Sequence, residues 1–257
     1  MRHGEIKMKN QPYTFSYDEL EKFLRFANKI APIVPMREAT KKKKVIILRQ
    51  DVDLDFQPSY DVYKIQKKIG ITSTFFVLTT ASTYNILSHS IRKMLKEMIK
   101  DGFEIGLHFD PTIYGNISSG DLQKQVEYEC EMLERIIKKP IISISLHNPS
   151  YTGEYPQFKG YINAYSKELF EDKRYISDSM RIDPELHPFR GKDPYEFVQH
   201  AKKYPLQIVL HPEQFLEKGG DYIDTIIRYH SNQMNTIVHE YFDNLSIIRR
   251  KRLYHIK

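Results

Sequence analysis

Acidic residues gather at the end of one apolar run, the stretch KVIILRQDVDLD at 44–55. The run of valine, isoleucine and leucine at its start is typical of a buried strand. Residues at i and i+2 of a strand share a face, so Arg49, Asp51 and Asp53 point the same way. Carboxylates on one face at the end of a core strand can bind a cation or move a proton, which predicts chemistry at that end.

Histidines end three further strand-like runs in the same way: EIGLHF at 104–109, IISISLH at 141–147 and LQIVLH at 206–211. Strand alternation places His108, His147 and His211 on a face of small or polar residues, opposite isoleucine and leucine. A proline follows each run closely and stops it. The imidazoles therefore stand at the carboxyl ends of their strands, as the carboxylates of the first run do.

Strand patterns and helix patterns alternate along the chain. The expected strands are 45–53, 72–79, 104–109, 141–147, 175–179 and 206–211, with a short candidate at 161–165. The expected helices are about 16–30, 58–69, 88–100, 119–138, 194–203 and 222–248. Such alternation implies parallel strands joined by helical crossovers, hence an α/β fold, whose active sites lie at the carboxyl ends of the strands. No linker or repeat divides the chain, so we expect one domain over 1–257, with its core at about 44–250.

Composition bounds the class of protein. A chain of 257 residues, 40% hydrophobic and 28% charged, suits a soluble globular protein. No apolar run is long enough for a membrane span, the first 15 residues lack the apolar segment of a secretion signal, and Cys130 is the single cysteine. We therefore expect a cytoplasmic protein without disulfides, thiolate metal cage or membrane span.

Basic residues raise the question of a nucleic-acid partner. The lysines at 41–44 and a basic C-terminal stretch contribute to a net charge of +6. No RNA- or DNA-binding motif accompanies them, and they do not form a stripe interleaved with aromatic residues. We expect solvated lysines beside buried elements and no nucleic-acid partner.

Aspartate and neutral histidine together are ligands for divalent metals such as zinc, iron, manganese or nickel. Three histidines and two aspartates at matching strand ends therefore predict one shared metal site. Each residue also has a structural alternative. A histidine at a strand end is often only hydrogen-bonded, and Arg49 could serve only to pair with Asp51.

With these residues in view, the chain from about 45 to about 215 resembles the polysaccharide deacetylases, the NodB-like carbohydrate esterases. LRQDVD is similar to the first motif of that family, an apolar strand ending in Asp-x-Asp, and DGFEIGLHF is similar to the second, Gly-x-Glu-Ile-Gly-x-His. HNP at 147–149 stands in the place of the third motif, Arg-x-Pro, and YISDS at 175–179 in that of the fourth. QIVLHP resembles the last motif.

The resemblance implies a fold and a role for each residue. The fold is a single distorted (β/α) barrel of six or seven parallel strands, preceded by a helix at about 16–30. Asp51 would be the catalytic base and His211 the general acid, while Asp178 orients a catalytic group. Asp53 and His108 would bind a divalent metal, with zinc the first candidate. The implied reaction removes the N-acetyl group from a sugar or polysaccharide precursor, so a carbohydrate is the expected partner.

Two positions depart from the family pattern. The second motif ordinarily has another histidine four residues after the first, and here that residue is Thr112. The arginine of the third motif, which orients the base, is His147 here. With Asp-Val-Asp and one histidine in the second motif, the chain resembles a divergent branch associated with surface-polysaccharide gene products more than the secreted chitin and peptidoglycan deacetylases.

The third metal ligand is therefore open, because two protein ligands are fewer than the three usual at a catalytic zinc. We predict His147, which ends a neighbouring strand on the inward face. Asp110 is the second choice and Thr112 the third. Alternatively, His147 replaces the family's arginine and hydrogen-bonds Asp51 without touching the metal.

Other functions fit the same residues. The chain could be a non-catalytic sugar-binding protein that has the polar opening at the strand ends but no longer binds a metal, since fold does not determine function. It could also be a metal hydrolase acting on a different amide, an ester or a phosphoester. Metal content together with acetate release separates these possibilities.

Overall fold

The strands form one parallel sheet. In the computed structural model, which describes residues 14–39, 43–179, 189 and 191–244, seven strands follow one another in the order β6-β5-β4-β3-β2-β8-β7. An eighth strand, β1, pairs with the start of β2, and all of these pairings are parallel. The bounds are β1 Ile33–Val34, β2 Ile46–Val52, β3 Thr74–Leu78, β4 Glu104–Phe109, β5 Ser143–Leu146, β6 Ile162–Asn163, β7 Tyr175–Ser177 and β8 Leu206–Leu210.

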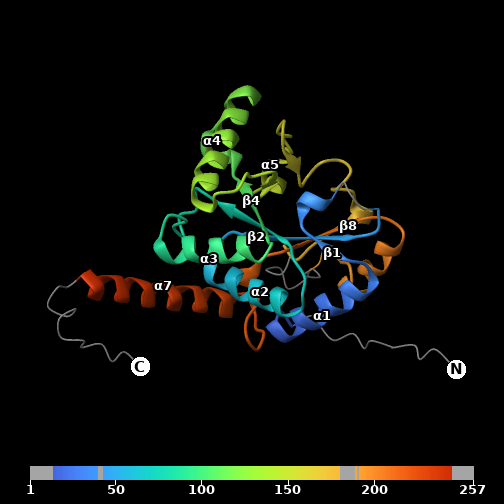
Figure 1. The fold of residues 1–257 in the computed structure, drawn as a ribbon, viewed down its shortest axis with the longest axis horizontal. Helices are drawn as coiled ribbons and strands as arrows, with labels where there is room; N and C mark the ends of the chain where they lie inside the picture. The colour runs from blue at the N-terminus through green and yellow to red at the C-terminus, as the bar shows by residue number, and fades with distance from the viewer. Residues whose placement is uncertain (1–13, 40–42, 180–188, 190, 245–257) are drawn as a thin grey trace.

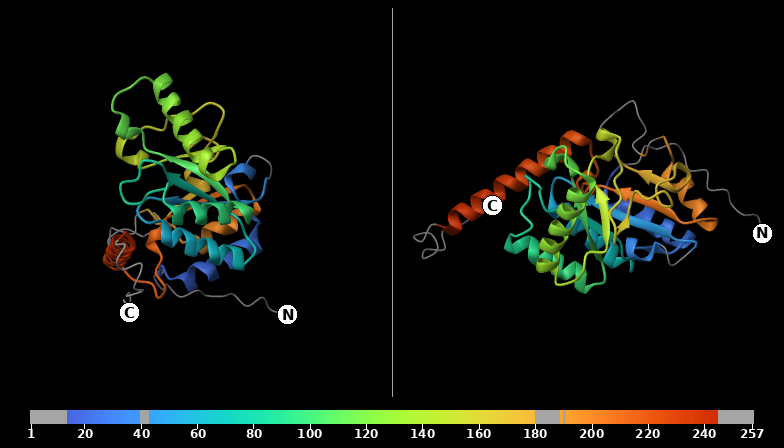
Figure 2. Two further views of the ribbon diagram at one scale, coloured as in Figure 1. Left: turned by 60° about the vertical axis from the view of Figure 1, so that its left-hand side comes forward. Right: turned by 90° about the horizontal axis from the view of Figure 1, so that it is seen from above.

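The sheet curls into an incomplete barrel with helices along its outside (Figures 1 and 2). Among the described residues no ladder joins its two end strands, β6 and β7. The α-helices are α1 Tyr17–Ile30, α2 Phe56–Lys68, α3 His89–Lys100, α4 Ser119–Ile137, α5 Pro149–Thr152, α6 Pro194–Phe197 and α7 Tyr222–Asn244, with short 3-10 turns between some elements. The prediction of a distorted (β/α) barrel of parallel strands is confirmed.

Side-chain caps set where the main helices begin. The hydroxyls of Ser16, Ser88 and Ser118 accept backbone N–H groups at the starts of α1, α3 and α4, and the carboxylate of Asp55 does the same for α2. Each cap satisfies an amide that the first turn of a helix leaves unpaired. None of the helices in the described part of the chain is long and apolar enough to cross a membrane.

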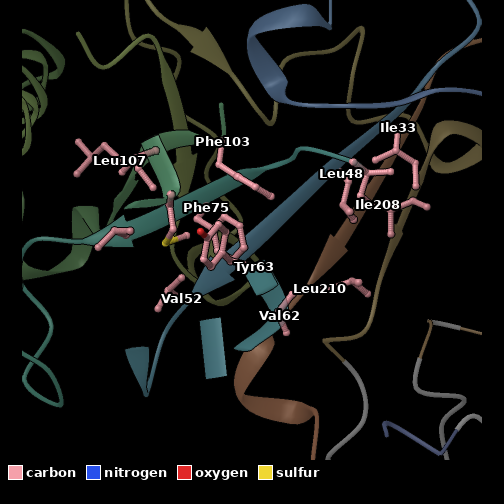
Figure 3. Packing of buried hydrophobic residues seen from close by; sticks show 14 of the residues in the cluster. Ile33, Leu48, Val52, Val62, Tyr63, Phe75, Phe103, Leu107, Ile208 and Leu210 are labelled. Carbon is pink, nitrogen blue, oxygen red and sulfur yellow. The ribbon is translucent and has the colours of Figure 1, made fainter. Parts of the chain in front are cut away.

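Apolar residues pack on both faces of the sheet. The larger cluster lies between the outer face and the helices and includes Leu48 and Phe75 (Figure 3). A smaller cluster, with Ile47 and Phe76, lies on the inner face near the start of the strands. Along β2 the inward residue after Ile47 is Arg49, so the interior changes from apolar to polar toward the carboxyl ends. The site can therefore be polar without loss of the core.

Gly106 allows β4 to pack closely inside the barrel. A Cβ at this position would lie 2.4 Å from a ring carbon of Phe76 and 2.8 Å from Oγ of Ser143. Interiors are packed too tightly to absorb such an overlap without movement. The glycine of EIGLH thus has a packing reason, two residues before His108.

The expected strands and helices are present, with ends that differ by a few residues. The helix expected at 194–203 is α-helical only in α6 and continues as a 3-10 turn, Val198–Lys202. The short candidate at 161–165 is β6. Two elements were not predicted, β1 and the single turn α5, because two to four residues carry too little periodicity to be recognised. The end of the last expected helix, 245–248, lies outside the described residues.

Candidate active site

Four strands bring their polar ends to one edge of the barrel, which we call the mouth. Asp51 lies in β2 and Asp53 directly after it, His108 lies in β4, His147 directly follows β5 and His211 directly follows β8. All four strands involved are parallel, so their carboxyl ends meet at one edge of the barrel. The structure therefore brings these five predicted site residues together.

Asp53, His108 and His147 direct ligand atoms at one point. Nε2 of His108 lies 3.0 Å from Oδ1 of Asp53, and Nδ1 of His147 lies 3.4 Å from the same oxygen. The two ring nitrogens are 3.3 Å apart. Within the described part of the chain these three residues form a group with one ligand atom each, all within 4.8 Å of one another. One carboxylate and two imidazoles are a donor set that zinc and similar ions accept.

The environment of Asp53 fits a cation. Its Oδ1 is buried and accepts no well-formed hydrogen bond from the described residues, although His108 Nε2 is so near. Burial raises the pKa of Asp53, but the contacts of His108 and His147 outweigh burial and hold the pKa of this carboxyl well below its ordinary range. Asp53 is therefore a carboxylate at neutral pH, crowded by nitrogen atoms that do not satisfy it.

His108 is held in the tautomer that ligation requires. Its Nδ1 lies 3.1 Å from the backbone oxygen of Ser145, the residue directly beside it in the β4–β5 pairing. A carbonyl oxygen only accepts, so Nδ1 carries the proton and Nε2 keeps its lone pair toward Asp53. The register of two strands thus orients this imidazole.

His147 turns its Nδ1 into the same group. The side-chain amide of Asn148 contacts the other ring nitrogen, Nε2, at 3.0 Å and so fixes the ring from the outside. Burial lowers the pKa of His147, but contact with Asp53 outweighs it, and the pKa is raised above its ordinary value. The side chain is 19% exposed, so the group is open to the mouth on this side.

Asp51 is fixed by other residues than His147. Nη2 of Arg49 donates to Oδ2 of Asp51 at 3.1 Å, and the hydroxyl of Ser145 donates to the same oxygen at 3.3 Å. Arg49 is fully buried, its Nη2 also donates to the Tyr165 hydroxyl, and its guanidinium lies over the Tyr165 ring at 4.6 Å. Oδ1 of Asp51 is buried and has no hydrogen-bond partner among the described residues, which leaves it able to accept a proton.

His211 stands across the mouth, held by Asp178. One carboxylate oxygen of Asp178 accepts from Nδ1 of His211 and the other from its backbone N–H. Nε2 of His211 faces Asp53, 3.8 Å from its Oδ2. Burial lowers the pKa of His211, but the charge and hydrogen bond of Asp178, with help from Asp53, raise it well above its ordinary value. His211 is therefore an imidazolium near neutral pH, with one N–H toward the mouth.

The two lower-ranked candidates for the third ligand lie elsewhere. Oδ1 of Asp110 accepts from the backbone N–H and the hydroxyl of Thr112, at 2.9 Å and 2.6 Å, and so caps a 3-10 turn, Pro111–Tyr114. Both contacts are exposed. These two residues pair with each other, and neither belongs to the ligand group around Asp53.

A cavity of about 50 Å³ opens at the mouth, and its lining includes residues that the sequence did not single out. Tyr165, Phe170 and Tyr175 form an aromatic wall with Tyr155, whose rings meet at centroid distances of 4.7–5.6 Å. The signal was present as a high density of aromatic residues between 151 and 175. It was not decisive, because most of the aromatic residues of this chain serve the core.

No family model and no curated protein sequence matches the chain. Solved structures do resemble it. The Xyl-CE4 domain of a multidomain xylanase from the hindgut metagenome of Trinervitermes trinervoides is 14% identical, with a TM-score of 0.45 over 76% of this chain and 85% of that one. The chitin deacetylase of Colletotrichum lindemuthianum is 16% identical, with a TM-score of 0.44 over 74% and 83%.

A family 4 carbohydrate esterase from Bacillus anthracis covers more of the chain, 92% of it and 88% of its own length, at 15% identity and a TM-score of 0.41. These names are those of the carbohydrate esterases and deacetylases that the sequence motifs resemble. At such identities and TM-scores the likeness concerns the path of the chain and not its chemistry.

Proposed function

We propose that this protein is a metal-dependent hydrolase that removes the acetyl group from an N-acetylated sugar or glycan precursor. One observation carries the proposal. A carboxylate–imidazole–imidazole group, Asp53 with His108 and His147, lies beside a buried carboxylate, Asp51, and faces an imidazolium, His211. A cation site, a base and an acid in one small mouth are the parts that amide hydrolysis needs.

Asp53, His108 and His147 would hold the ion, and zinc is the ion that we propose. A divalent ion bound there would lower the pKa of a water molecule toward neutrality and polarise a carbonyl oxygen. The fit rests on the chain's own donors: the unsatisfied Oδ1 of Asp53, the free lone pair on Nε2 of His108 and the inward Nδ1 of His147.

Asp51 is the proposed base. Its free Oδ1 can take the proton of the attacking water, while Arg49 and Ser145 hold Oδ2 and keep the carboxylate from turning. In the family pattern an arginine at the position of His147 orients the base. The contact between Arg49 and Asp51 supports a different arrangement, in which Arg49, two residues earlier on the same strand, orients the base. Position 147 is then available for a metal ligand.

His211 is the proposed acid. Asp178 accepts a hydrogen bond from Nδ1–H of His211, which leaves Nε2–H directed at the mouth, so His211 can protonate the departing amine. The raised pKa of His211 keeps it charged before the bond breaks. Asp178 is a positioning residue in this scheme, because it acts through His211.

The substrate class rests on the sequence motifs and on the aromatic wall. Rings such as Tyr155, at the exposed end of the wall, can stack on the apolar face of a sugar. Two-metal phosphoesterases need bridging carboxylates, whereas the ligand group found among the described residues holds a single carboxylate. This favours one ion and an acyl-transfer reaction. The cytoplasm is the location that we propose.

Acetate release tests the proposal. Zinc-loaded protein should release acetate from N-acetylglucosamine oligomers or from N-acetylated glycan precursors. Asp51→Asn should keep its metal and lose roughly 10²–10⁴-fold in rate, because an amide cannot take a proton. Asp55→Asn is the matched control, since asparagine caps α2 as well as aspartate does. Stoichiometric metal with no acetate from any of these substrates would contradict deacetylation, and protein that binds sugar without metal would favour the non-catalytic alternative.

A further inference from the structure

Helix α7 extends away from the body of the molecule (Figures 1 and 2). It carries exposed apolar residues along its length. The hydrogen bonds that tie it to the body come from its first half. Arg228 donates to the backbone oxygens of Phe215 and Glu213, Asn232 to the carboxylate of Asp55, and Gln233 to the backbone of Thr83. The second half of α7 extends beyond these attachments.

One line of residues on α7 is spaced as in a coiled coil. We call it the α7 stripe: Ile223, Ile227, His230, Met234, Ile237 and Tyr241. The steps along it are four, three, four, three and four residues, the spacing of the a and d positions of a heptad repeat. Its five large apolar members are each 60–63% exposed. Such a seam is made to pack against another helix, and nothing described in this chain covers it.

We propose that α7 is a dimerisation element whose stripe packs antiparallel against the same stripe of a second copy of this chain. The stripe is close to symmetric about its middle. With the two helices centred near residue 232, Ile223 meets Tyr241 of the other copy, Ile227 meets Ile237, and His230 meets Met234. A two-fold axis requires such self-complementarity, and here it pairs large side chains in every layer.

The attachment of α7 to the body favours the antiparallel arrangement. Among the described residues, the hydrogen bonds from α7 to the body come from its first half. An antiparallel partner would therefore place its projecting second half along that first half. The two bodies then lie at opposite ends of the helix pair. A parallel pair would bring the two bodies to the same end, where they compete for space.

The exposed area is consistent with this pairing. Five side chains at this exposure present roughly 500 Å² of apolar surface, so two stripes would remove on the order of 1,000 Å² from water, about what a specific interface needs. Beside the stripe, at the flanking heptad positions, the described side chains are Asp224, Ile226, Ser231, Gln233 and Val238, of which a single one is charged.

A lipid surface is the main competing occupant. Helices that lie on anionic membranes carry lysine and arginine on their polar face. Residues 222–244 contain no lysine and one arginine, Arg228, which is bonded to the body. The composition of α7 thus favours a protein partner.

The first measurement is the mass in solution by light scattering over a concentration series. The protein should have about twice the 30.5 kDa mass of the chain. Ile237→Glu should raise the dissociation constant of the dimer at least about 30-fold, because it buries a charge in the seam. Asn235→Glu places the same charge on an exposed position outside the stripe and should leave the dimer intact, with unchanged circular dichroism in both variants. A monomer at every concentration overturns the proposal, as does a dimer that Ile237→Glu leaves intact.

Disulfide cross-linking then tests the direction. Mixed Ile227→Cys and Ile237→Cys proteins should form a covalent dimer on oxidation, whereas either variant alone should not. Cross-linking of Ile227→Cys to itself indicates parallel helices and overturns the antiparallel arrangement. Sedimentation with vesicles of phosphatidylcholine and phosphatidylglycerol is the last test, and a monomer that binds these vesicles through the stripe also overturns the proposal.

Discussion

Nη2 of Arg49 lies 3.1 Å from Oδ2 of Asp51, two residues further along the same strand, and neither side chain is more than 3% exposed. The pair shares the inward face of β2, so the strand that supplies the carboxylate also supplies the cation that holds it. His147 is therefore not needed to position Asp51. Its own contacts are with Asp53, His108 and Asn148.

Arg49→Lys should separate the positioning of Asp51 from its charge. Lysine keeps the positive charge, but its Nζ ends one bond short of the position of Nη2, the nitrogen that donates to both Asp51 and the Tyr165 hydroxyl, and it lacks the planar group that lies over the Tyr165 ring. We expect the rate of acetate release to fall about 10- to 100-fold with unchanged metal content. The free energy of unfolding should fall by about 1–3 kcal/mol, because buried donors and acceptors lose partners. Tyr165→Phe removes one of the two hydrogen bonds and should lose less rate; equal losses in both variants would argue against this role.

His147→Ala should lower metal occupancy about as much as His108→Ala does. Both remove one of three predicted ligands, and two ligands do not hold zinc tightly. The measurement is elemental analysis after dialysis, together with the rise in melting temperature on adding zinc, which binding to the folded state should produce. Asn148→Ala is the matched control, because it removes only the amide contact to Nε2 of His147 and leaves all three ligands in place. Full occupancy with lost activity would place His147 outside the ligand group, in the role that the family gives to arginine.

Asp178→Asn should shift the pH dependence of the rate. The acid must be protonated, so activity falls as the pH rises through the pKa of His211. Because Asp178 raises the pKa of His211, the fall in activity should occur at a pH above the ordinary pKa of histidine. Loss of the carboxylate should move the alkaline fall to lower pH, whether or not Asp53 binds a metal. Glu168→Gln, an exposed carboxylate-to-amide change, should leave the profile in place. An unmoved profile in Asp178→Asn would show that His211 is not the group that titrates.

The same contact predicts how stability depends on pH. Because the pKa of His211 is higher in the folded protein than in the unfolded chain, its contribution is fully present below about 6.5, the unfolded value. It is lost as the pH rises through the folded pKa. Asp178→Asn should flatten this loss in urea unfolding measured between about pH 6 and pH 9 in metal-free protein.

Gly106→Ala should destabilise the barrel without touching a site residue. The added methyl group overlaps the ring of Phe76, and overpacking of this kind costs about 1–3 kcal/mol. Urea unfolding measures the loss. Phe76→Leu in the same chain should restore part of it, because the smaller side chain makes room. A loss in Gly106→Ala that the second change does not reduce would point to the strand conformation instead.

Alternation within single strands determined much of this protein. The phase of β2 put Arg49, Asp51 and Asp53 on one face, and the phases of β4 and β8 did the same for His108 and His211. The period of a strand is a local property, so one stretch of sequence is enough to assign each side chain to a face. The chain breakers after the strands then located these residues at the carboxyl ends.

Only the tertiary structure decided which residues meet beyond the strand ends. By spacing, His147 and Asp110 were both candidates for the third metal ligand. The β4–β5 register places His147 beside Asp53, whereas Asp110 accepts the backbone N–H of Thr112 and caps a turn. The approach of Tyr165 to Arg49 and of the Asp178 carboxylate to His211 likewise depends on packing between distant segments. Strand phase says which face a side chain takes. Contacts after the last paired residue are set by loops and neighbouring strands, whose positions no local pattern contains.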